Sequence, residues 1–67
     1  MSVAKVTEIS ASSAEGFEQA IQEGIDRANK TLEKIEGAWI NEMKVVVEDG
    51  KIAEYRVNMK VSFILND

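Results

Sequence analysis

The clearest pattern in the chain is a strict alternation of apolar and polar residues near its C-terminal end. Between positions 53 and 65 every second residue is apolar or aromatic, and the residues between 54 and 62 on the other parity are polar or charged. A period of two is typical of a strand with one buried face. The pattern predicts a strand over residues 51–65 whose core-facing set is Ala53, Tyr55, Val57, Met59, Val61, Phe63 and Leu65.

The residues before this alternation predict a second strand and a tight turn. Asp49-Gly50 follows a valine-rich run, and this dipeptide is a strong signal for a two-residue hairpin turn of type I′. A strand over residues 38–48 would then pair with the C-terminal strand. Because loop length sets the register of a hairpin, Glu48 is expected opposite Lys51.

Extending this register along the hairpin predicts a group of residues on one sheet face. Trp39 falls opposite Lys60, and Met43 falls opposite Arg56. Directly opposed residues share a face, so these four side chains are expected together on the face away from the core. The same register assigns three more residues to that face, namely Asn41, Val45 and Val47.

The first half of the chain predicts a strand followed by one helix. Residues 3–9 are rich in β-branched side chains and favour a strand. Ser12 and Glu15 have the spacing of a capping box, which predicts a helix start near Ser13, and Gly37 is typical of a helix end. Apolar residues recur between them at helical spacing: Phe17, Ala20, Ile21, Gly24, Ile25, Ala28, Leu32 and Ile35.

These elements predict one α+β domain over residues 1–67, of the order β-α-β-β, in which a three-stranded antiparallel sheet wraps around one helix. One helix cannot cover both faces of a sheet, and the predicted outer face is half apolar. A chain of 67 residues without cysteine also has no disulfide to stabilise it. Small domains of this kind depend on oligomerisation, so other copies of the chain are the expected cover.

Composition narrows the classes of function. The net charge is −4 with acids and bases interspersed, which argues against a nucleic-acid partner because such proteins carry a basic face. The chain has no histidine or cysteine, so neither a zinc or transition-metal site nor an enzyme using such side chains is expected. No secretory signal or membrane-length apolar run occurs, and a cytoplasmic, non-enzymatic protein is the expectation.

The predicted group of Trp39, Met43, Arg56 and Lys60 has two interpretations. It combines an aromatic plane, a flexible thioether and two cations, and tryptophan and arginine are enriched at protein interfaces. The same side chains could also stack on a planar anionic ligand and pair with its charge. Both interpretations stay open, and the two coincide if the ligand lies between copies of the chain.

Two segments carry a family resemblance over nearly the whole chain. The run "AIQEGIDRANKTLEKIEGAW" is followed by "EYRVNMKVSF", with Tyr55, Val57, Val61 and Phe63 in the spacing Tyr-x-Val-x-x-x-Val-x-Phe. In this order the chain resembles the dodecin family. The resemblance implies a hollow homo-dodecamer of small subunits that binds flavin for storage and protection.

The resemblance also implies where a flavin would lie. In flavin-binding dodecins a tryptophan after the helix stacks on the flavin ring and a glutamine on the last strand hydrogen-bonds to it. These positions fall on Gly37 and Arg56 here, so Trp39 would stack from a position two residues later. The implied ligand is flavin mononucleotide (FMN), riboflavin or flavin adenine dinucleotide. The arginine also resembles a branch associated with calcium, so a structural dodecamer binding calcium, coenzyme A or no small molecule is the alternative.

Overall fold

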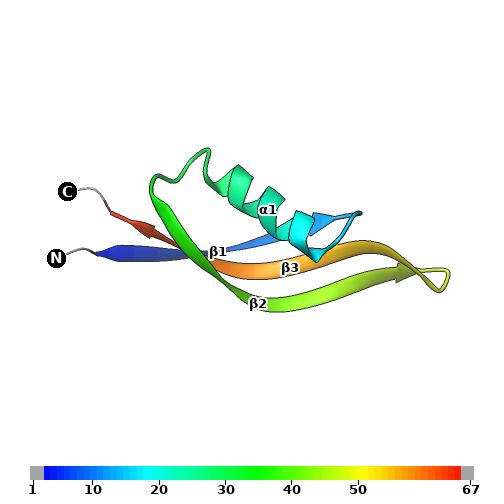
Figure 1. Cartoon of the computed structure of the whole chain (residues 1–67). Coiled ribbons are helices and arrows are strands. Elements are labelled where there is room, and N and C mark those ends of the chain that lie inside the picture. Colours follow the sequence, from blue (N-terminus) through cyan, green and yellow to red (C-terminus); the bar gives the residue numbers. More distant parts are fainter. Residues whose placement is uncertain (1–2, 66–67) are drawn as a thin grey trace.

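The computed structural model describes residues 3–65 and contains one helix on one three-stranded sheet (Figure 1). The elements in chain order are β1 (Ala4–Ser13), α1 (Phe17–Ala28), β2 (Ile35–Glu48) and β3 (Lys51–Ile64). The strand order is β1-β3-β2, and both pairings are antiparallel. The predicted fold class is confirmed, with the C-terminal strand at the centre of the sheet.

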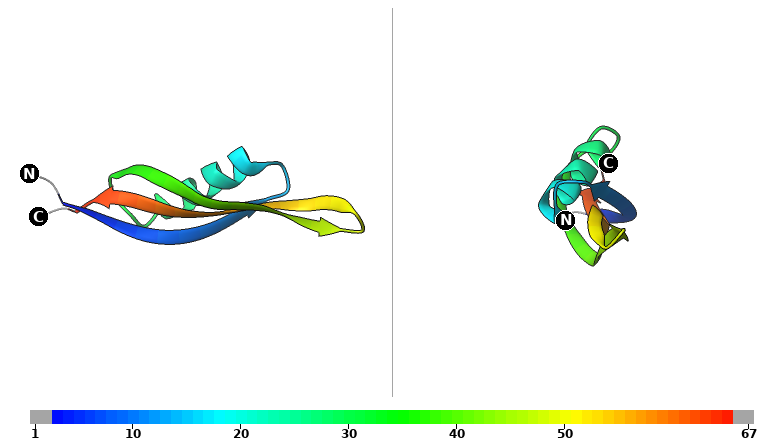
Figure 2. Two further views of the ribbon diagram at one scale, coloured as in Figure 1. Left: turned by 90° about the horizontal axis from the view of Figure 1, so that it is seen from below. Right: turned by 90° about the vertical axis from the view of Figure 1, so that its right-hand side faces the viewer.

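The core forms where the alternation of β3 meets the apolar stripe of the helix. Val57, Met59 and Val61 are at most 1% exposed and pack with Ala20 of α1. Figure 2 shows the helix on one side of the twisted sheet only. The centre of the predicted inner face of β3 is therefore confirmed, and it is flanked by several half-buried residues: Ile9, Ala11, Phe17, Ile21, Ile25, Ile35 and Ala38. The two ends of the predicted set are wrong, because Ala53 interrupts the pairing with β2 and Leu65 is 42% exposed beyond the end of the strand.

The hairpin turn agrees with its sequence signal. Asp49 and Gly50 have φ angles of 53° and 74°, and a type I′ turn requires positive φ at both central residues. The first pair after the turn is Glu48 with Lys51. The predicted turn position and its starting register are confirmed.

The predicted helix start is wrong by four residues. The serines at positions 10, 12 and 13 continue β1, so that its last pairs are Ser12 with Arg56 and Ser13 with Tyr55. Glu15 donates its backbone N–H to Ser13 Oγ at 3.0 Å, and Gly16 caps the helix without a side-chain hydrogen bond. Pairing with the long central strand satisfies the serine backbone, which outweighs the local capping signal.

The predicted helix end is also wrong, because α1 stops at Ala28 and not near Gly37. Asn29 is the C-cap, and Lys34 then adopts a φ of 57° before the chain enters β2. Ile35 pairs with Phe63, so the last apolar residue of the helical stripe belongs to the sheet. Full-length pairing with β3 outweighs the helical spacing of this segment.

The helix leaves one part of the sheet bare. It packs on β1 and β3, whereas the hairpin of β2 and β3 extends past it in a molecule of 51 × 19 × 13 Å (Figure 1). The helix side of β2 therefore carries exposed apolar side chains, with Met43 51% exposed. In the part of the chain that the structure describes, the helix is too short and too polar to cross a membrane.

Candidate ligand-binding site on the outer sheet face

The sheet face away from α1, called the outer face below, takes its side chains from all three strands. The β1–β3 pairing keeps one register from Ala4–Ile64 to Ser13–Tyr55. The β2–β3 pairing is interrupted by three register shifts. The composition of the outer face on the β2 side therefore depends on where these shifts fall.

Two of the shifts are β-bulges that cancel each other. Ala53 is an extra residue in β3, because Val46 pairs with Glu54 and the next residue, Val47, pairs with Ile52. Asn41 is an extra residue in β2, between the pairs formed by Ile40 and Glu42. Because the extra residues lie on opposite strands, the register beyond both bulges returns to the one set by the turn. Trp39 consequently lies opposite Lys60, as the sequence predicted.

Between the two bulges the predicted register is wrong by one residue. Met43 lies opposite Val57 and not opposite Arg56, and Lys44 takes the position opposite Arg56. Since a one-residue slip moves every side chain to the other face, Met43 and Val45 lie on the helix side of the sheet. The predicted group of four residues is thus divided, and its methionine is on the wrong face.

The outer face that results is mainly polar. Its three central rows, in the order β1–β3–β2, are Glu8–Lys60–Trp39, Ser10–Asn58–Glu42 and Ser12–Arg56–Lys44. A hollow of about 260 Å³ lies over the last two rows. Sequence reasoning missed Glu42 and Lys44, because the unbroken register assigned them to the other face.

Hydrogen bonds hold two of these side chains in place. Arg56 Nε donates to Glu54 Oε1 at 2.6 Å, and Asn58 Nδ2 donates to Glu42 Oε1 at 2.9 Å. The bond from Arg56 lowers the pKa of the Glu54 carboxyl, against the opposing effect of desolvation. Arg56 is therefore oriented along β3, with four of its five N–H donors left over from the Nε bond.

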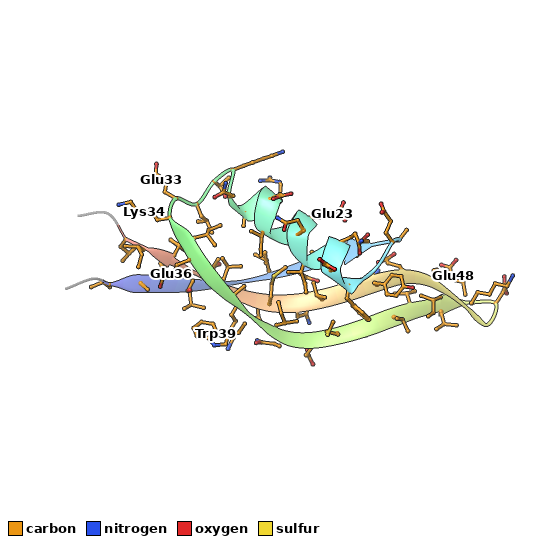
Figure 3. All side chains as sticks on the ribbon, in the orientation of Figure 1. Glu23, Glu33, Lys34, Glu36, Trp39 and Glu48 are labelled. Atoms are coloured by element: carbon orange, nitrogen blue, oxygen red, sulfur yellow. The ribbon has the colours of Figure 1, made fainter. Side chains whose placement is uncertain are left out.

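Trp39 stands apart from this network as an aromatic plane. It projects from β2 on the side away from the helix (Figure 3) and is 59% exposed. Gly37 lies in the neighbouring outer-face row, opposite Ser62, whose Oγ donates to the Gly37 carbonyl at 3.4 Å. A Cβ added at Gly37 would meet only Ser62 Oγ, at 3.8 Å. Gly37 and Trp39 therefore lie on the same face of the sheet, with open space above Gly37.

A second hollow lies on the helix side and was not predicted. It has a volume of about 510 Å³ and is lined by β1, the C-terminal half of α1 and the two residues Thr31 and Leu32. Its lining combines apolar side chains such as Ile9 and Ala11 with the charged side chains of Glu23 and Arg27. Gly24 allows close packing here, since an added Cβ would lie 2.4 Å from Met59 Cε.

The fold and the outer face together define a small α+β module with aromatic and cationic side chains on the outer face and a helix too short to cover its sheet. Residues 3–66 match the profile of the Dodecin family. The chain belongs to the dodecin family, as the sequence resemblance predicted.

Relatives and solved structures support this assignment. Dodecin from Thermus thermophilus is 34% identical over 97% of this chain and 94% of its own length. Calcium dodecin from Mycobacterium tuberculosis is 35% identical over 94% of this chain and 89% of its own length. The structure of dodecin from Streptomyces davaonensis has a TM-score of 0.94 at 39% identity and covers 98% of this chain and 97% of its own. One of these relatives is named a calcium dodecin and the other two simply dodecins, so the ligand has to be argued from this chain's own residues.

Proposed function

We propose that the chain forms a homo-dodecamer that binds flavin on its outer face and stores it without acting as an enzyme. Dodecamer assembly is known for the family. The polar sheet face away from α1 is suited to line the water-filled interior of a hollow particle. The proposed site comprises Trp39, Gly37, Arg56 and Lys60, and the place of action is the cytoplasm. Met43 is no longer part of this site, because it lies on the helix side.

The observation that carries the proposal is the exposed ring of Trp39 on a polar face. A tryptophan that is 59% exposed leaves an aromatic plane open for stacking on a flat ring system. Lys60 lies opposite it, and the open space at Gly37 leaves room for a flat ring system beside it. A flavin ring stacked on Trp39 would satisfy these features together.

Charge on the same face supports an anionic flavin. Arg56 is four residues along β3 from Lys60, about 13 Å at 3.3 Å per residue. An extended ribityl chain, together with the reach of a long arginine side chain, can bridge this distance. FMN is therefore expected to bind at least as well as riboflavin, with an advantage that decreases as salt rises.

Flavin titration followed by fluorescence quenching tests the proposal. Stacking on an aromatic side chain contributes about 1–3 kcal/mol, so Trp39→Ala is expected to raise the Kd for FMN by about 5- to 150-fold. The double variant Gly37→Trp/Trp39→Ala moves the indole to the position of the family's flavin tryptophan and should recover binding. Unchanged affinity in Trp39→Ala would remove this residue from the ligand site.

A non-flavin dodecamer is the second candidate, and the identity to calcium dodecin favours it. Arginine at position 56 can donate hydrogen bonds but cannot accept one, and Gly37 has no side chain to stack. Absence of any flavin binding, with a calorimetric signal for Ca²⁺, would establish this alternative. Among residues 3–65, no three acidic side chains of one chain are grouped to hold a metal ion.

The assembly has its own measurement. Size-exclusion chromatography with light scattering at micromolar concentration is expected to give a particle of twelve chains. A folded monomer under these conditions would contradict the dodecamer. If Trp39→Ala breaks the particle and the intact protein binds no flavin, Trp39 seals an interface between copies.

A further inference from the structure

The two borders of the sheet are open strand edges. The strand order β1-β3-β2 places β1 at one border and β2 at the other, and among residues 3–65 each of them pairs with β3 alone. An edge strand presents a row of free N–H and C=O groups that can pair with an added strand. Each chain therefore offers two places for strand addition, one at either side of its sheet.

The hollow on the helix side extends to the open edge of β1. It is lined by residues 7 and 9–11 of β1 and by the C-terminal half of α1. Ser10 belongs to the outer face, yet it lines this hollow as well, so the hollow reaches the border of the strand. Several peptide-binding domains accept an extended segment at such an edge, where the backbone gives affinity and pockets for alternate side chains give specificity.

The opposite border of the sheet carries a segment that matches this hollow. Met43, Val45 and Val47 are exposed apolar residues of β2, spaced at the period of two. Met43 and Val45 lie on the helix side of the sheet, where the hairpin extends past α1 (Figure 1). A strand with these side chains needs an apolar cover on that side, and Ile9 and Ala11 in the hollow provide one.

We propose that β2 of one copy adds to the free edge of β1 of the next copy, with its residues 43–47 in the helix-side hollow. The two sheets then form one sheet in the order β1-β3-β2-β1-β3-β2 with both helices on the same side. The added β2 runs parallel to the neighbouring β1, because both strands are antiparallel to β3 within a chain. The inference rests on the proposed function only for its assembly into a homo-oligomer and does not involve the flavin.

The surface area of the single chain supports a second copy as the occupant. A compact monomer of 7.4 kDa is expected to expose about 4200 Å², whereas this chain exposes 4982 Å². The excess of about 800 Å² equals the share of one partner in an interface of standard size. The contact is also head-to-tail, and contacts of this kind close into rings, which agrees with a closed particle.

Cysteine cross-linking tests the contact, since the chain has no cysteine of its own. Within one chain β3 separates β1 from β2, so the two strands lie about 10 Å apart, and a disulfide needs Cα atoms within about 7 Å. A disulfide in Ile9→Cys/Val45→Cys therefore forms only between copies. Mild oxidation is expected to give covalent oligomers larger than a dimer for this variant or for one shifted by two residues, Thr7→Cys/Val45→Cys or Ala11→Cys/Val45→Cys.

Single variants are the matched controls for the direction of the contact. Ile9→Cys and Val45→Cys alone should stay unlinked, and particles assembled from a mixture of the two should give a dimer that contains one of each. Disulfides within either single variant would show that two like edges meet, which overturns the proposal. Absence of any disulfide in a particle of the parent size overturns it as well.

A charge on the hairpin gives a second readout. Val45→Glu should break the particle into smaller species in size-exclusion chromatography with light scattering, because the added strand would bury an unpaired carboxylate. Val3→Glu makes the same change at an exposed valine outside β2 and should keep the parent size. Circular dichroism verifies that both variants fold. An intact particle in Val45→Glu contradicts the inference.

Cysteine labelling measures whether the hollow is filled. Thr7→Cys lies in the hollow and should lose most of its reactivity with a maleimide in the particle, and regain it when Val45→Glu is added. Equal reactivity in the two backgrounds would leave the hollow open to a segment of another protein. The inference then fails, while the dodecamer and its flavin site stand. A parent chain that elutes as a monomer would contradict both the inference and the dodecamer.

Discussion

The two halves of the sheet follow different rules. On the β1 side the pairing with β3 runs from Ala4 to Ser13 without a shift, under the helix that packs on these strands. On the β2 side the pairing shifts three times. Two of these shifts, at Asn41 and Ala53, lie beyond the end of β2 that packs against the core through Ile35 and Ala38. A strand whose inner face is buried has a strongly specified register, whereas a strand open on both faces can bend to re-aim its side chains. The packed half carries stability, and the open half carries the candidate ligand residues.

The largest expected effect compares two methionines on the helix side of the sheet. Met59 is 0% exposed in the packed half, and Met43 is 51% exposed in the open half. Met59→Ala should lower the free energy of unfolding by about 2–5 kcal/mol, and Met43→Ala by about 0.5 kcal/mol. Urea denaturation at a fixed chain concentration measures both.

The two outcomes sharpen the comparison in different ways. If Met43→Ala costs as much as Met59→Ala, the helix side of β2 is covered by another copy in the assembled particle. The loss of unfolding free energy would then depend on chain concentration more strongly for Met43→Ala than for Met59→Ala. A small change in the free energy of unfolding for Met59→Ala would contradict the tight packing of the half that the helix covers.

Sequence reasoning succeeded in the packed half because alternation and burial agree there. The inner face of β3 could be read from its period of two, and the pair of Trp39 with Lys60 from the turn. The pairing of Lys44 with Arg56 could not, since cancelling bulges leave both ends of a hairpin unchanged. One signal was available: Val45, Val46 and Val47 form a run without alternation. The pattern therefore does not indicate which face of the sheet each of these side chains occupies.

The helix was over-predicted for a related reason. Residues 29–35 fit a helical stripe, but Ile35 begins a strand that matches the full length of β3. Asn29 and Thr31 are weak helix formers, and they mark the true end at Ala28. Local spacing cannot weigh the backbone hydrogen bonds that a distant strand offers, so tertiary pairing decided this boundary.

An intermediate effect is expected at the hairpin turn, which connects the two strands of the open half. Gly50 has a φ of 74°, a region that a β-branched residue resists. Gly50→Val should lower the free energy of unfolding by about 1–3 kcal/mol. Asp49→Gly is the matched control, because glycine adopts the φ of 53° at that position freely. An unchanged melting temperature in Gly50→Val would put the register of the whole hairpin in doubt.

The smallest expected effect is the acid sensitivity of the contact between Glu54 and Arg56, which lies where the two halves meet on the outer face. The hydrogen bond from Arg56 lowers the pKa of Glu54 below 4.5. A carboxyl whose pKa is lower in the folded state binds fewer protons there than in the unfolded chain. Its contribution to stability is therefore present above pH 4.5 and is lost as the pH falls through the lowered pKa.

Glu54→Gln removes this titration and should flatten the acid limb of the stability curve slightly, as measured by urea denaturation between pH 6 and pH 3. Glu48→Gln is a suitable control, because it removes a carboxyl from the tip of the same hairpin. The same substitution keeps an oxygen that can accept from Arg56 Nε but removes the negative charge beside it, so FMN affinity should rise while riboflavin affinity stays constant. An acid limb as steep in Glu54→Gln as in the parent protein would mean that exposure and solvent screening cancel the contact. Arg56 would then be oriented by its strand alone.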